Sequence, residues 1–415
     1  MTSEDLVLER IERTRRARPR VREDRITMAH GAGGKATKSL IEAVFLEAFR
    51  NPLLEPLEDG ASLGVGDHRL ALTTDSYVVS PLFFPGGNIG DLAVNGTVND
   101  LSMTGAVPLY LTEAEVAELL TPADALAAVE GSFRRLAAGE VQNLPRRRAE
   151  VEGGLFALMA AVDRELGLAG LKAYTWLEEG TPFVVVLFDT EKAEVAGVIE
   201  ADKLGQLRTG AASGVAAKYL ARDGATSLGI IGCGWQARTQ VAAIREALPG
   251  IERVVAYCRS GDRLREFCDE VGAEPGESHR DPAEQDVVVT ATTSRDPVLR
   301  GEWLRPGALV CAIGANDPRR RELDNVVLER AAFVCCDSVE QSREESGDLI
   351  EPVEAGVLDW LEVHELQEVI AGELPGRQAD DDVVLFKSNG LAAWDVAIGA
   401  VALERARERG AGTQL

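Results

Sequence analysis

The sequence lacks the features that mark membrane-spanning, secreted and nucleic-acid-binding proteins. No apolar run in its 415 residues approaches the length that crosses a bilayer. The charged stretch 1–25 is not followed by the apolar segment of a secretory signal, so we interpret it as a solvated lead-in. Basic residues are outnumbered, with 44 Lys and Arg against 68 Asp and Glu. The resulting net charge of −24 argues against binding to nucleic acid or to an anionic membrane.

Residues that bind metals or form disulfides are also sparse. The four histidines are scattered along the chain, and the spacing of the cysteines matches no zinc template. Most cysteines lie within or beside predicted buried strands, which is typical of reduced thiols in a cytoplasmic protein. We therefore predict a cytoplasmic location and no structural metal. The cysteines are Cys233, Cys258, Cys268, Cys311, Cys335 and Cys336.

One stretch, SLGIIGCGWQARTQ at 227–240, predicts a strand, a tight turn and a helix. The turn spells GxGxxA, a pattern typical of dinucleotide binding, although an ordinary α/β turn is the alternative. The first glycine frees the backbone to turn, the second lets it approach a pyrophosphate, and the alanine lets the helix pack closely on its strand. The helix N-terminus would then face the diphosphate. The predicted cofactor-binding residues here are Gly232, Cys233, Gly234, Trp235, Gln236 and Ala237.

The end of the next predicted strand should meet the adenosine ribose of the cofactor. NAD-preferring sites usually have Asp or Glu there, but this chain has Cys258, Arg259 and Ser260. Because a guanidinium and a hydroxyl suit a 2′-phosphate, we predict NADP as the preferred cofactor, with NAD as the second choice. The alternative is that Arg259 is a solvated residue at a strand end. Strand-like runs from 286 and 308 complete a predicted Rossmann-like domain at 224–337.

Residues 26–111 have a different character. A glycine-rich turn and an amphipathic helix precede a strand, a Pro-Gly-Gly turn and a second helix. Asp75 and Asp100 could hold Mg²⁺ against a nucleotide phosphate, or only cap local backbone. Three sequence segments closely resemble the opening of the hydrogenase maturation factor HypE, in the ATP-binding AIR synthase-related group. They are HGAGGKA, TTDSYVVSPLFFPGGNIGDLA and GTVNDLSMTGAVP. That family's second domain and C-terminal cysteine do not follow.

From about Leu111 to the C-terminus, the chain resembles the ornithine cyclodeaminase and mu-crystallin family. The resemblance rests on LKAYT, FDTEKAEVAGVIEADKLGQLRTGAASGVAAKYL, GEWLRPGALVCAIGANDPRRRELD, ESGDL and LFKSNGLAAWDVA. It implies an α/β homodimer in which the Rossmann domain, 224–337, is inserted in an α+β substrate and dimerisation domain made of 112–223 and 338–415. We expect the HypE-like part to be a truncated α/β segment with uncovered apolar surface, joined at a seam near Leu111 and Thr112.

The same resemblance implies a cationic clamp for the α-carboxylate of a substrate. Arginine can hold a carboxylate through two parallel hydrogen bonds, and a nearby ammonium adds charge. For Arg146, beside Arg147 and Arg148, a solvated basic patch is the alternative. The segment KSNG resembles the part of the family that returns to the nicotinamide, with a simple turn as the alternative, and adds Ser388 and Gly390 to the cofactor site. The matching clamp residues are Arg146, Lys172, Arg208 and Thr209.

Two departures from the family pattern concern the catalytic chemistry. The family's acid/base carboxylate follows the last Rossmann strand, where this chain has Asn316, with Asp317 one step later. Asp317 serves as the acid/base if the turn re-aims it, and otherwise it caps a following helix. True ornithine cyclodeaminases resemble one another in a glutamate, suited to the distal amine of ornithine, where this chain has Ala157.

We therefore predict an NAD(P)-dependent enzyme that acts on a small α-amino or α-imino acid. Lys172, Arg208 and Asp317 are the predicted catalytic residues. Cyclic imine reduction or amino-acid dehydrogenation fits the altered pocket better than ornithine cyclodeamination. One alternative is a non-catalytic NADPH-binding protein, and another is an ATP-binding role in hydrogenase maturation for the N-terminal segment.

Overall fold

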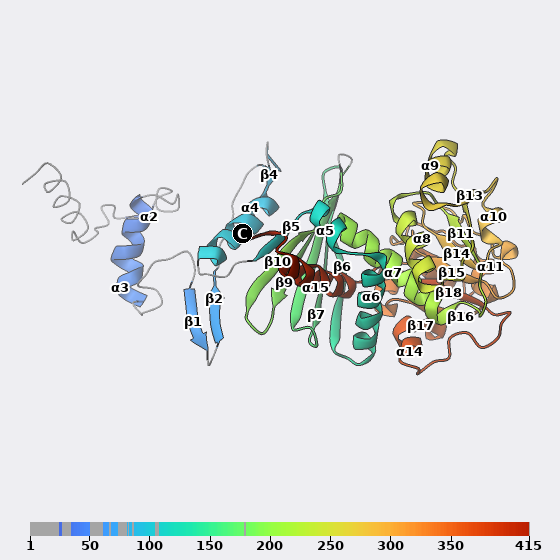
Figure 1. Cartoon of the computed structure of the whole chain (residues 1–415). Coiled ribbons are helices and arrows are strands. Elements are labelled where there is room, and N and C mark those ends of the chain that lie inside the picture. The colour runs from blue at the N-terminus through green and yellow to red at the C-terminus, as the bar shows by residue number, and fades with distance from the viewer. Residues whose placement is uncertain are drawn as a thin grey trace, which may run out of the picture. The chain divides into compact units, whose positions relative to one another are not determined.

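The computed structural model describes residues 25–26, 35–49, 61–65, 68–73, 81, 83–84, 87–103, 108–177 and 180–414. The chain divides into two compact units, Met1–Ala106 and Val107–Leu415 (Figure 1). Among the described residues, no helix combines the length and apolar character needed to cross a membrane. The second unit contains the two large sheets, and the candidate site lies between them.

The N-terminal unit contains the predicted amphipathic helix as three consecutive segments, the middle one wound as a π-helix. Several of its apolar side chains are exposed, among them Val44, Phe45 and Phe49. Asp75, one of the two predicted Mg²⁺ ligands, lies outside the described residues, as does the side chain of Asp100. The elements are α2 (Lys35–Leu40), η2 (Ile41–Phe45), α3 (Leu46–Phe49), β1 (Ala61–Val65), β2 (His68–Leu72), β3 (Phe83–Phe84), β4 (Gly87–Asn88) and α4 (Ile89–Met103).

The second unit begins with a seven-stranded sheet in the order β19-β5-β10-β9-β8-β7-β6. Strands β6 to β10 are antiparallel neighbours, whereas β5 runs parallel to β10. The seam predicted near Leu111 and Thr112 falls at the end of a strand of this sheet, whereas the two compact units divide between Ala106 and Val107. The strands are β5 (Leu109–Leu111), β6 (Val141–Val151), β7 (Gly154–Asp163), β8 (Leu168–Trp176), β9 (Phe183–Asp189), β10 (Glu194–Glu200) and β19 (Thr413–Gln414).

Side-chain alternation gives this sheet one covered and one exposed apolar face. Helix α15 (Ala392–Arg409) packs against β7, β8 and β9 on the covered face, where Met159 and Leu187 are buried (Figure 1). The opposite face carries large apolar side chains that are more than one-third exposed, which is typical of a surface that another protein covers. These side chains are Leu144, Phe156, Leu158, Val162 and Phe188.

The second sheet has eight parallel strands in the order β13-β12-β11-β14-β15-β18-β16-β17. Its central strands are buried along their whole length, as expected for parallel strands covered on both faces. The sheet extends past the predicted Rossmann range, 224–337, because β17 and β18 come after it and β18 pairs with both β15 and β16. The strands are β11 (Ser227–Ile231), β12 (Arg253–Tyr257), β13 (Glu274–Pro275), β14 (Val287–Thr290), β15 (Leu309–Ala312), β16 (Ala331–Cys336), β17 (Val363–Glu365) and β18 (Val383–Lys387).

Helices cover and connect the two sheets. The longest, α7, follows β10 and packs against α8, the helix of the GxGxxA motif. This contact joins the part of the unit that holds the seven-stranded sheet to the part that holds the eight-stranded sheet. The helices are α5 (Glu113–Leu119), α6 (Pro122–Ala137), α7 (Asp202–Leu220), α8 (Trp235–Ala247), α9 (Gly261–Val271), α10 (Arg280–Ala283), η3 (Gly301–Trp303), α11 (Asn325–Arg330), α12 (Val339–Glu345), α13 (Gly347–Glu354), η4 (Trp360–Glu362) and α14 (Leu366–Ile370).

Candidate functional site

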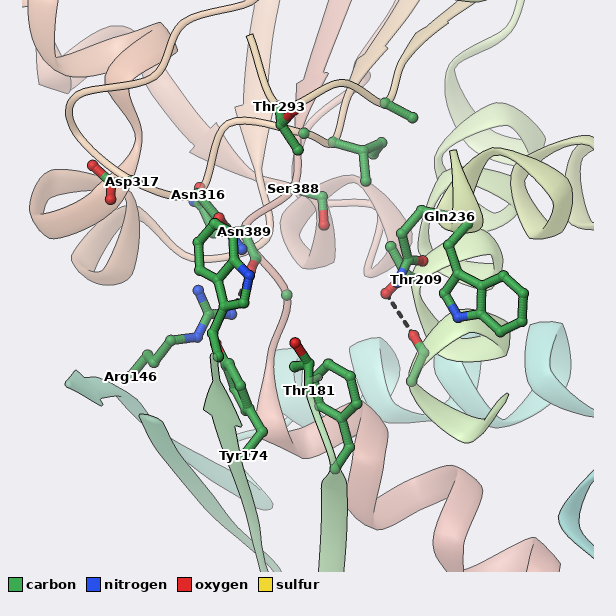
Figure 2. A pocket seen from close by; sticks show the side chains of 18 of the residues that line it. Arg146, Tyr174, Thr181, Thr209, Gln236, Thr293, Asn316, Asp317, Ser388 and Asn389 are labelled. Atoms are coloured by element: carbon green, nitrogen blue, oxygen red, sulfur yellow. Dashed lines mark hydrogen bonds between the residues drawn. The ribbon is translucent and has the colours of Figure 1, made fainter. Parts of the chain in front are cut away.

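A cavity of about 590 Å³ lies between the two sheets of the second unit. Side chains of β6, β7 and β8 line one side, and the loops after β11, β14, β15 and β18 line the other. Figure 2 shows Arg146 and Tyr174 extending from their strands toward this space, with Ser388 and Thr293 across from them. Open α/β sheets bind ligands at the carboxyl ends of their strands, so the position suits a dinucleotide and a small substrate.

The GxGxxA sequence forms the predicted strand, turn and helix. Gly232 follows β11 directly and has a φ of +108°, and a Cβ there would lie 2.5 Å from the carbonyl oxygen of Ala291. Only glycine fits this position. A Cβ on Gly234 would meet no atom within 4 Å, so the backbone there faces open space beside the first turn of α8. The turn fits a diphosphate, and Gly234, Trp235 and Gln236 line the cavity.

Arg259 and Ser260, predicted to contact the adenosine ribose, lie beside this turn but do not line the cavity. The backbone N–H of Gly232 donates to the carbonyl of Tyr257 at 2.9 Å, which brings the end of β12 next to the motif. Arg259 and Ser260 follow, and both are exposed. The Ser260 hydroxyl accepts a 3.5 Å hydrogen bond from the first turn of α9. Buried inside the motif are Cys233 and Ala237.

The predicted turn after β18 reaches the cavity and is held there by a buried carboxylate. Oδ2 of Asp337 accepts from the Ser388 hydroxyl at 3.0 Å and from the backbone N–H groups of Asn389 and Gly390 at 2.7 Å each. Gly390 has a φ of +86°, and a Cβ there would overlap the guanidinium of Arg208. Both predicted residues of this turn therefore line the cavity, next to the clamp.

A second buried carboxylate, Glu322, supports the loops after β14 and β15. Its two oxygens accept from the hydroxyls of Thr290 and Thr292 and from the backbone N–H groups of Thr292 and Gly314, at 2.7 to 2.9 Å. Burial, and then the nearby Asp348, raise the pKa of Glu322. Because Thr292 and Gly314 line the cavity, this carboxylate fixes the wall opposite the clamp.

The predicted clamp residues Lys172 and Arg208 share a buried carboxylate. Nζ of Lys172 lies 3.0 Å and Nε of Arg208 lies 3.3 Å from Oδ1 of Asp395, in the first turn of α15. Gly205 makes room, because a Cβ there would lie 2.6 Å from Nζ of Lys172. Burial lowers the pKa of Lys172 to about 8, against the opposing effect of Asp395. A lysine with this pKa can exchange a proton near neutral pH.

Arg208 presents its terminal nitrogens to the cavity. No residue that the structure describes accepts a side-chain hydrogen bond from them, although the side chain is only 10% exposed. The planar fork of the guanidinium is therefore available for a carboxylate ligand. Thr209, the neighbouring predicted residue, donates its hydroxyl hydrogen bond to the carbonyl of Gly205 at 2.7 Å and also lines the cavity.

Arg146, the third predicted clamp residue, is occupied by protein groups. Its Nη1 lies 3.0 Å from both carboxylate oxygens of Glu345, and its Nη2 donates to the carbonyl of Asn389 at 2.7 Å. A β-bulge after Leu144 turns Arg146 to the covered face of the sheet, where simple alternation would put it on the exposed face. The basic-patch alternative does not hold for Arg146, which is 5% exposed. It shapes the cavity wall instead of offering a free fork.

Asp317, the predicted acid/base, lines the cavity but is tied to Arg319. Its carboxylate accepts from the backbone N–H of Arg319 at 2.9 Å and from two guanidinium nitrogens at 2.8 and 3.0 Å. These contacts lower the pKa of Asp317 to about 2. A turn and not a helix follows, so Asp317 does not have the alternative helix-capping role. Figure 2 shows Asp317 beyond Asn316 at the edge of the site.

The sequence analysis did not predict the acidic residues that position the site. Asp337, Glu345 and Asp395 each hold a predicted residue in place from a distant part of the chain. For Asp395 a signal exists, because an aspartate within the apolar run LAAWDVAIGAVA must be paired if it is buried.

Comparison with known proteins matches two parts of the chain to two different families, and the matches overlap at 106–141. Residues 106–410 match the model of the ornithine cyclodeaminase/mu-crystallin family, and residues 57–141 match that of the AIR synthase related protein, N-terminal domain. The carbamoyl dehydratase HypE of Rhizobium leguminosarum is 55% identical over 94 residues. Those residues are 23% of this chain and 27% of that relative, so this chain spans only about a quarter of HypE.

The relatives of the second unit match over nearly their whole length. The alanine dehydrogenase of Archaeoglobus fulgidus is 36% identical over 322 residues, 74% of this chain and 98% of the relative. The iminosuccinate reductase of Paracoccus denitrificans is 32% identical over 316 residues, 73% of this chain and 98% of the relative.

Two solved structures share this fold. The Δ1-pyrroline-2-carboxylate reductase of Thermococcus litoralis, in complex with NADH and L-proline, has a TM-score of 0.70 and 32% identity, over 74% of this chain and 100% of that chain. An archaeal alanine dehydrogenase dimer with bound NAD also has a TM-score of 0.70, with 34% identity over 74% of this chain and 99% of that one. The cavity, its glycine turn and these matches agree: the chain belongs to the ornithine cyclodeaminase/mu-crystallin family.

Proposed function

We propose that the second unit is an NAD(P)-dependent reductase that converts a small α-imino acid to the α-amino acid, and catalyses the reverse oxidation. The observation that carries the proposal is the pair of cations beside the glycine turn. The guanidinium fork of Arg208 has no hydrogen-bond acceptor among the described residues, and Lys172 is buried next to it. When bound, the nicotinamide would supply or accept the hydride. The named relatives and neighbours act on alanine, Δ1-pyrroline-2-carboxylate and iminosuccinate, which supports an imine or amine α to a carboxylate.

Two residues have distinct tasks in this proposal. Arg208 binds the α-carboxylate through two parallel hydrogen bonds, which fixes the imine carbon relative to the cavity wall. Lys172 adds positive charge and gives a proton to the imine nitrogen, for which its pKa of about 8 is suited. Asp317, with a pKa of about 2 and an ion pair to Arg319, is ionised at neutral pH and is a poor proton donor. We therefore propose Lys172, and not Asp317, as the acid.

The choice of cofactor and the oligomeric state are two further parts of the proposal. For the cofactor, we propose NADP, because the exposed Arg259 and Ser260 stand where an acidic residue would favour NAD. Neighbouring structures contain NADH and NAD, so NAD stays the competing choice. Arg259→Asp should weaken NADPH binding by about 10- to 100-fold and leave NADH binding little changed. Equal losses for both cofactors would contradict this assignment.

For the assembly, we propose a homodimer through the exposed apolar face of the seven-stranded sheet. An apolar surface of this kind is usually covered in solution, and the archaeal alanine dehydrogenase neighbour is a dimer. Leu158→Glu places a charge at the centre of this face and should give a monomer in sedimentation. Leu361→Glu, at an 85% exposed position in η4, is the matched control and should keep the dimer. Dimers of both variants would contradict the proposal.

The experiment that tests the activity follows nicotinamide absorbance after Δ1-pyrroline-2-carboxylate is added to the full-length protein with NADPH or NADH. Oxidation of NADPH in preference to NADH supports the reductase and the NADP assignment together. Tight cofactor binding without turnover, on this substrate and on 2-oxo acids with ammonium, would favour a non-catalytic binding protein. Failure to bind either cofactor would contradict the proposed function.

A further inference from the structure

The end of the cavity opposite the glycine turn is lined by arginines. In Figure 2, Gln236 lies on one side of the cavity and Asn316 and Asp317 lie on the other. Arg148 and Arg320 line the cavity together with Asn316 and Asp317. A substrate whose α-carboxylate is held by the clamp would extend its side chain toward one of these ends, and the dinucleotide turn occupies the first. The side chain therefore meets the arginines.

Arg320 lies against an aromatic ring and makes no ion pair with the residues that the structure describes. The central carbon of its guanidinium lies 4.6 Å from the ring centre of Trp176, at the end of β8, which is a cation–π contact. Within the described part of the chain, its side chain makes no ion pair and no hydrogen bond. Burial, and then the neighbouring Arg295, Arg319 and Arg148, act to lower its pKa, while Asp317 opposes them. An anion at this position would relieve that unfavourable field.

The other charged groups at this end are already engaged. Nη2 of Arg148 lies 2.6 Å from Glu345 and donates to the carbonyl of Asn316 at 2.8 Å. Asp317 is bound by Arg319. The described surroundings thus leave no carboxylate free for a distal amine, and Ala157, which replaces the cyclodeaminase glutamate, is fully buried. The end of the cavity lined by Arg148 and Arg320 therefore repels an ammonium group, and the guanidinium of Arg320 is left to bind an anion.

We propose that Arg320, stacked on Trp176, binds a second carboxylate, so that the substrate is an α-imino dicarboxylic acid. The proposal rests on the reductase function above and narrows its substrate class. The imine forms from a 2-oxo dicarboxylic acid and ammonia with loss of water. A hydride from NAD(P)H then adds to the imine carbon and a proton to the nitrogen, which gives the α-amino dicarboxylic acid and NAD(P)⁺. The iminosuccinate reductase relative acts on a compound of this class.

The test compares two 2-oxo acids that differ by one carboxylate. Freshly prepared oxaloacetate and pyruvate, each with ammonium, are reduced by the full-length protein with NAD(P)H, and kcat/KM is measured for each. We expect a higher kcat/KM for oxaloacetate. In Arg320→Gln, the ratio of the oxaloacetate value to the pyruvate value should fall by about 10- to 100-fold, the worth of a charge-assisted hydrogen-bond pair. An unchanged ratio in this variant overturns the proposal.

Arg343→Gln is the matched control, because Arg343 also stacks on a tryptophan, Trp360, at 5.0 Å, but does not line the cavity. This variant should keep the wild-type ratio, and a fall equal to that of Arg320→Gln would overturn the assignment to Arg320.

Glu178 and Glu179 lie outside the described residues, close to Trp176 in sequence. Their double change to Gln should not raise the ratio, since a rise would mean that they already neutralise Arg320. No turnover with any imine would overturn the reductase function itself, whereas turnover with an unchanged ratio overturns the dicarboxylate inference alone.

Discussion

Nζ of Lys172 lies 3.0 Å from Oδ1 of Asp395, and both side chains are buried. The same oxygen faces Nε of Arg208 at 3.3 Å, so one carboxylate orients the proposed acid and the proposed carboxylate-binding fork. Oδ2 of Asp395 is buried and has no hydrogen-bond partner among the described residues. A buried oxygen without a hydrogen bond lowers the stability of the fold. We infer that Asp395 is placed to pair with the two cations and not to satisfy both of its own oxygens.

The first prediction concerns pH. Below a pKa of about 8, Lys172 is protonated and can give a proton to the imine, so kcat/KM for reduction should fall as pH rises through about 8. Asp395 raises this pKa, and Asp395→Asn should therefore move the falling limb to lower pH, by about one to three units. The measurement is a pH profile of kcat/KM. Asp395→Glu should restore part of the shift, and a limb that stays in place would contradict the role of Lys172.

The second prediction concerns the clamp. Arg208→Ala removes both hydrogen bonds to the α-carboxylate and should lower kcat/KM by about 100-fold or more, while the dissociation constant of the cofactor stays near that of the wild type. Arg208→Lys keeps the charge without the fork and should fall between the two. Cofactor titration by fluorescence and steady-state kinetics separate these effects. Normal turnover of every accepted substrate by the alanine variant would show that the clamp assignment is wrong.

The third prediction uses two glycines with positive φ. Gly390→Ala would overlap the guanidinium of Arg208, whereas Gly356→Ala, at a φ of +71°, would meet no atom within 4 Å. Both variants should lose about 1–2 kcal/mol of unfolding free energy, because alanine disfavours this conformation. Only Gly390→Ala should also raise the KM for the imino acid. Chemical unfolding and kinetics on the pair check this, and equal KM values would argue against the contact.

The fourth prediction concerns the wall opposite the clamp. Glu322→Gln replaces an oxygen that accepts two hydrogen bonds with an NH₂ group, which then faces other donors. We expect a loss of about 1–3 kcal/mol in unfolding free energy and weaker cofactor binding, because Thr292 and Gly314 lose their anchor. Glu344→Gln, whose partly exposed side chain pairs with Arg147, is the control and should change neither quantity. Unaltered cofactor affinity in Glu322→Gln would show that the wall does not depend on this carboxylate.

The sequence is informative where the chemistry is local. The GxGxxA turn needs glycine at Gly232 for a conformation that few other residues adopt, so a short motif was enough to predict strand, turn and helix. The clamp residues Lys172 and Arg208 were predicted from a resemblance, and the structure brings them together. Whether these residues bind and react as expected stays a prediction.

What the sequence could not supply are relationships between distant segments. Glu345 reaches Arg146 across 199 residues of sequence, and no pattern within either segment indicates the other. The position of β18 was missed for a similar reason, since a long connection separates it from β16 although the two strands are hydrogen-bonded neighbours. Nor did the sequence indicate that Arg319, only two residues away, contacts both carboxylate oxygens of Asp317.

The wide separation of Lys172 and Asp395 in the sequence also determines when their ion pair can form during synthesis of the chain. The two residues are 223 positions apart, so at ribosomal speeds the lysine is made tens of seconds before its counter-ion. Until α15 emerges, β8 has neither the helix that covers it nor the charge that balances Lys172. The nascent sheet therefore carries an unpaired cation until Asp395 has been made, and the clamp is completed only after α15 has been synthesised.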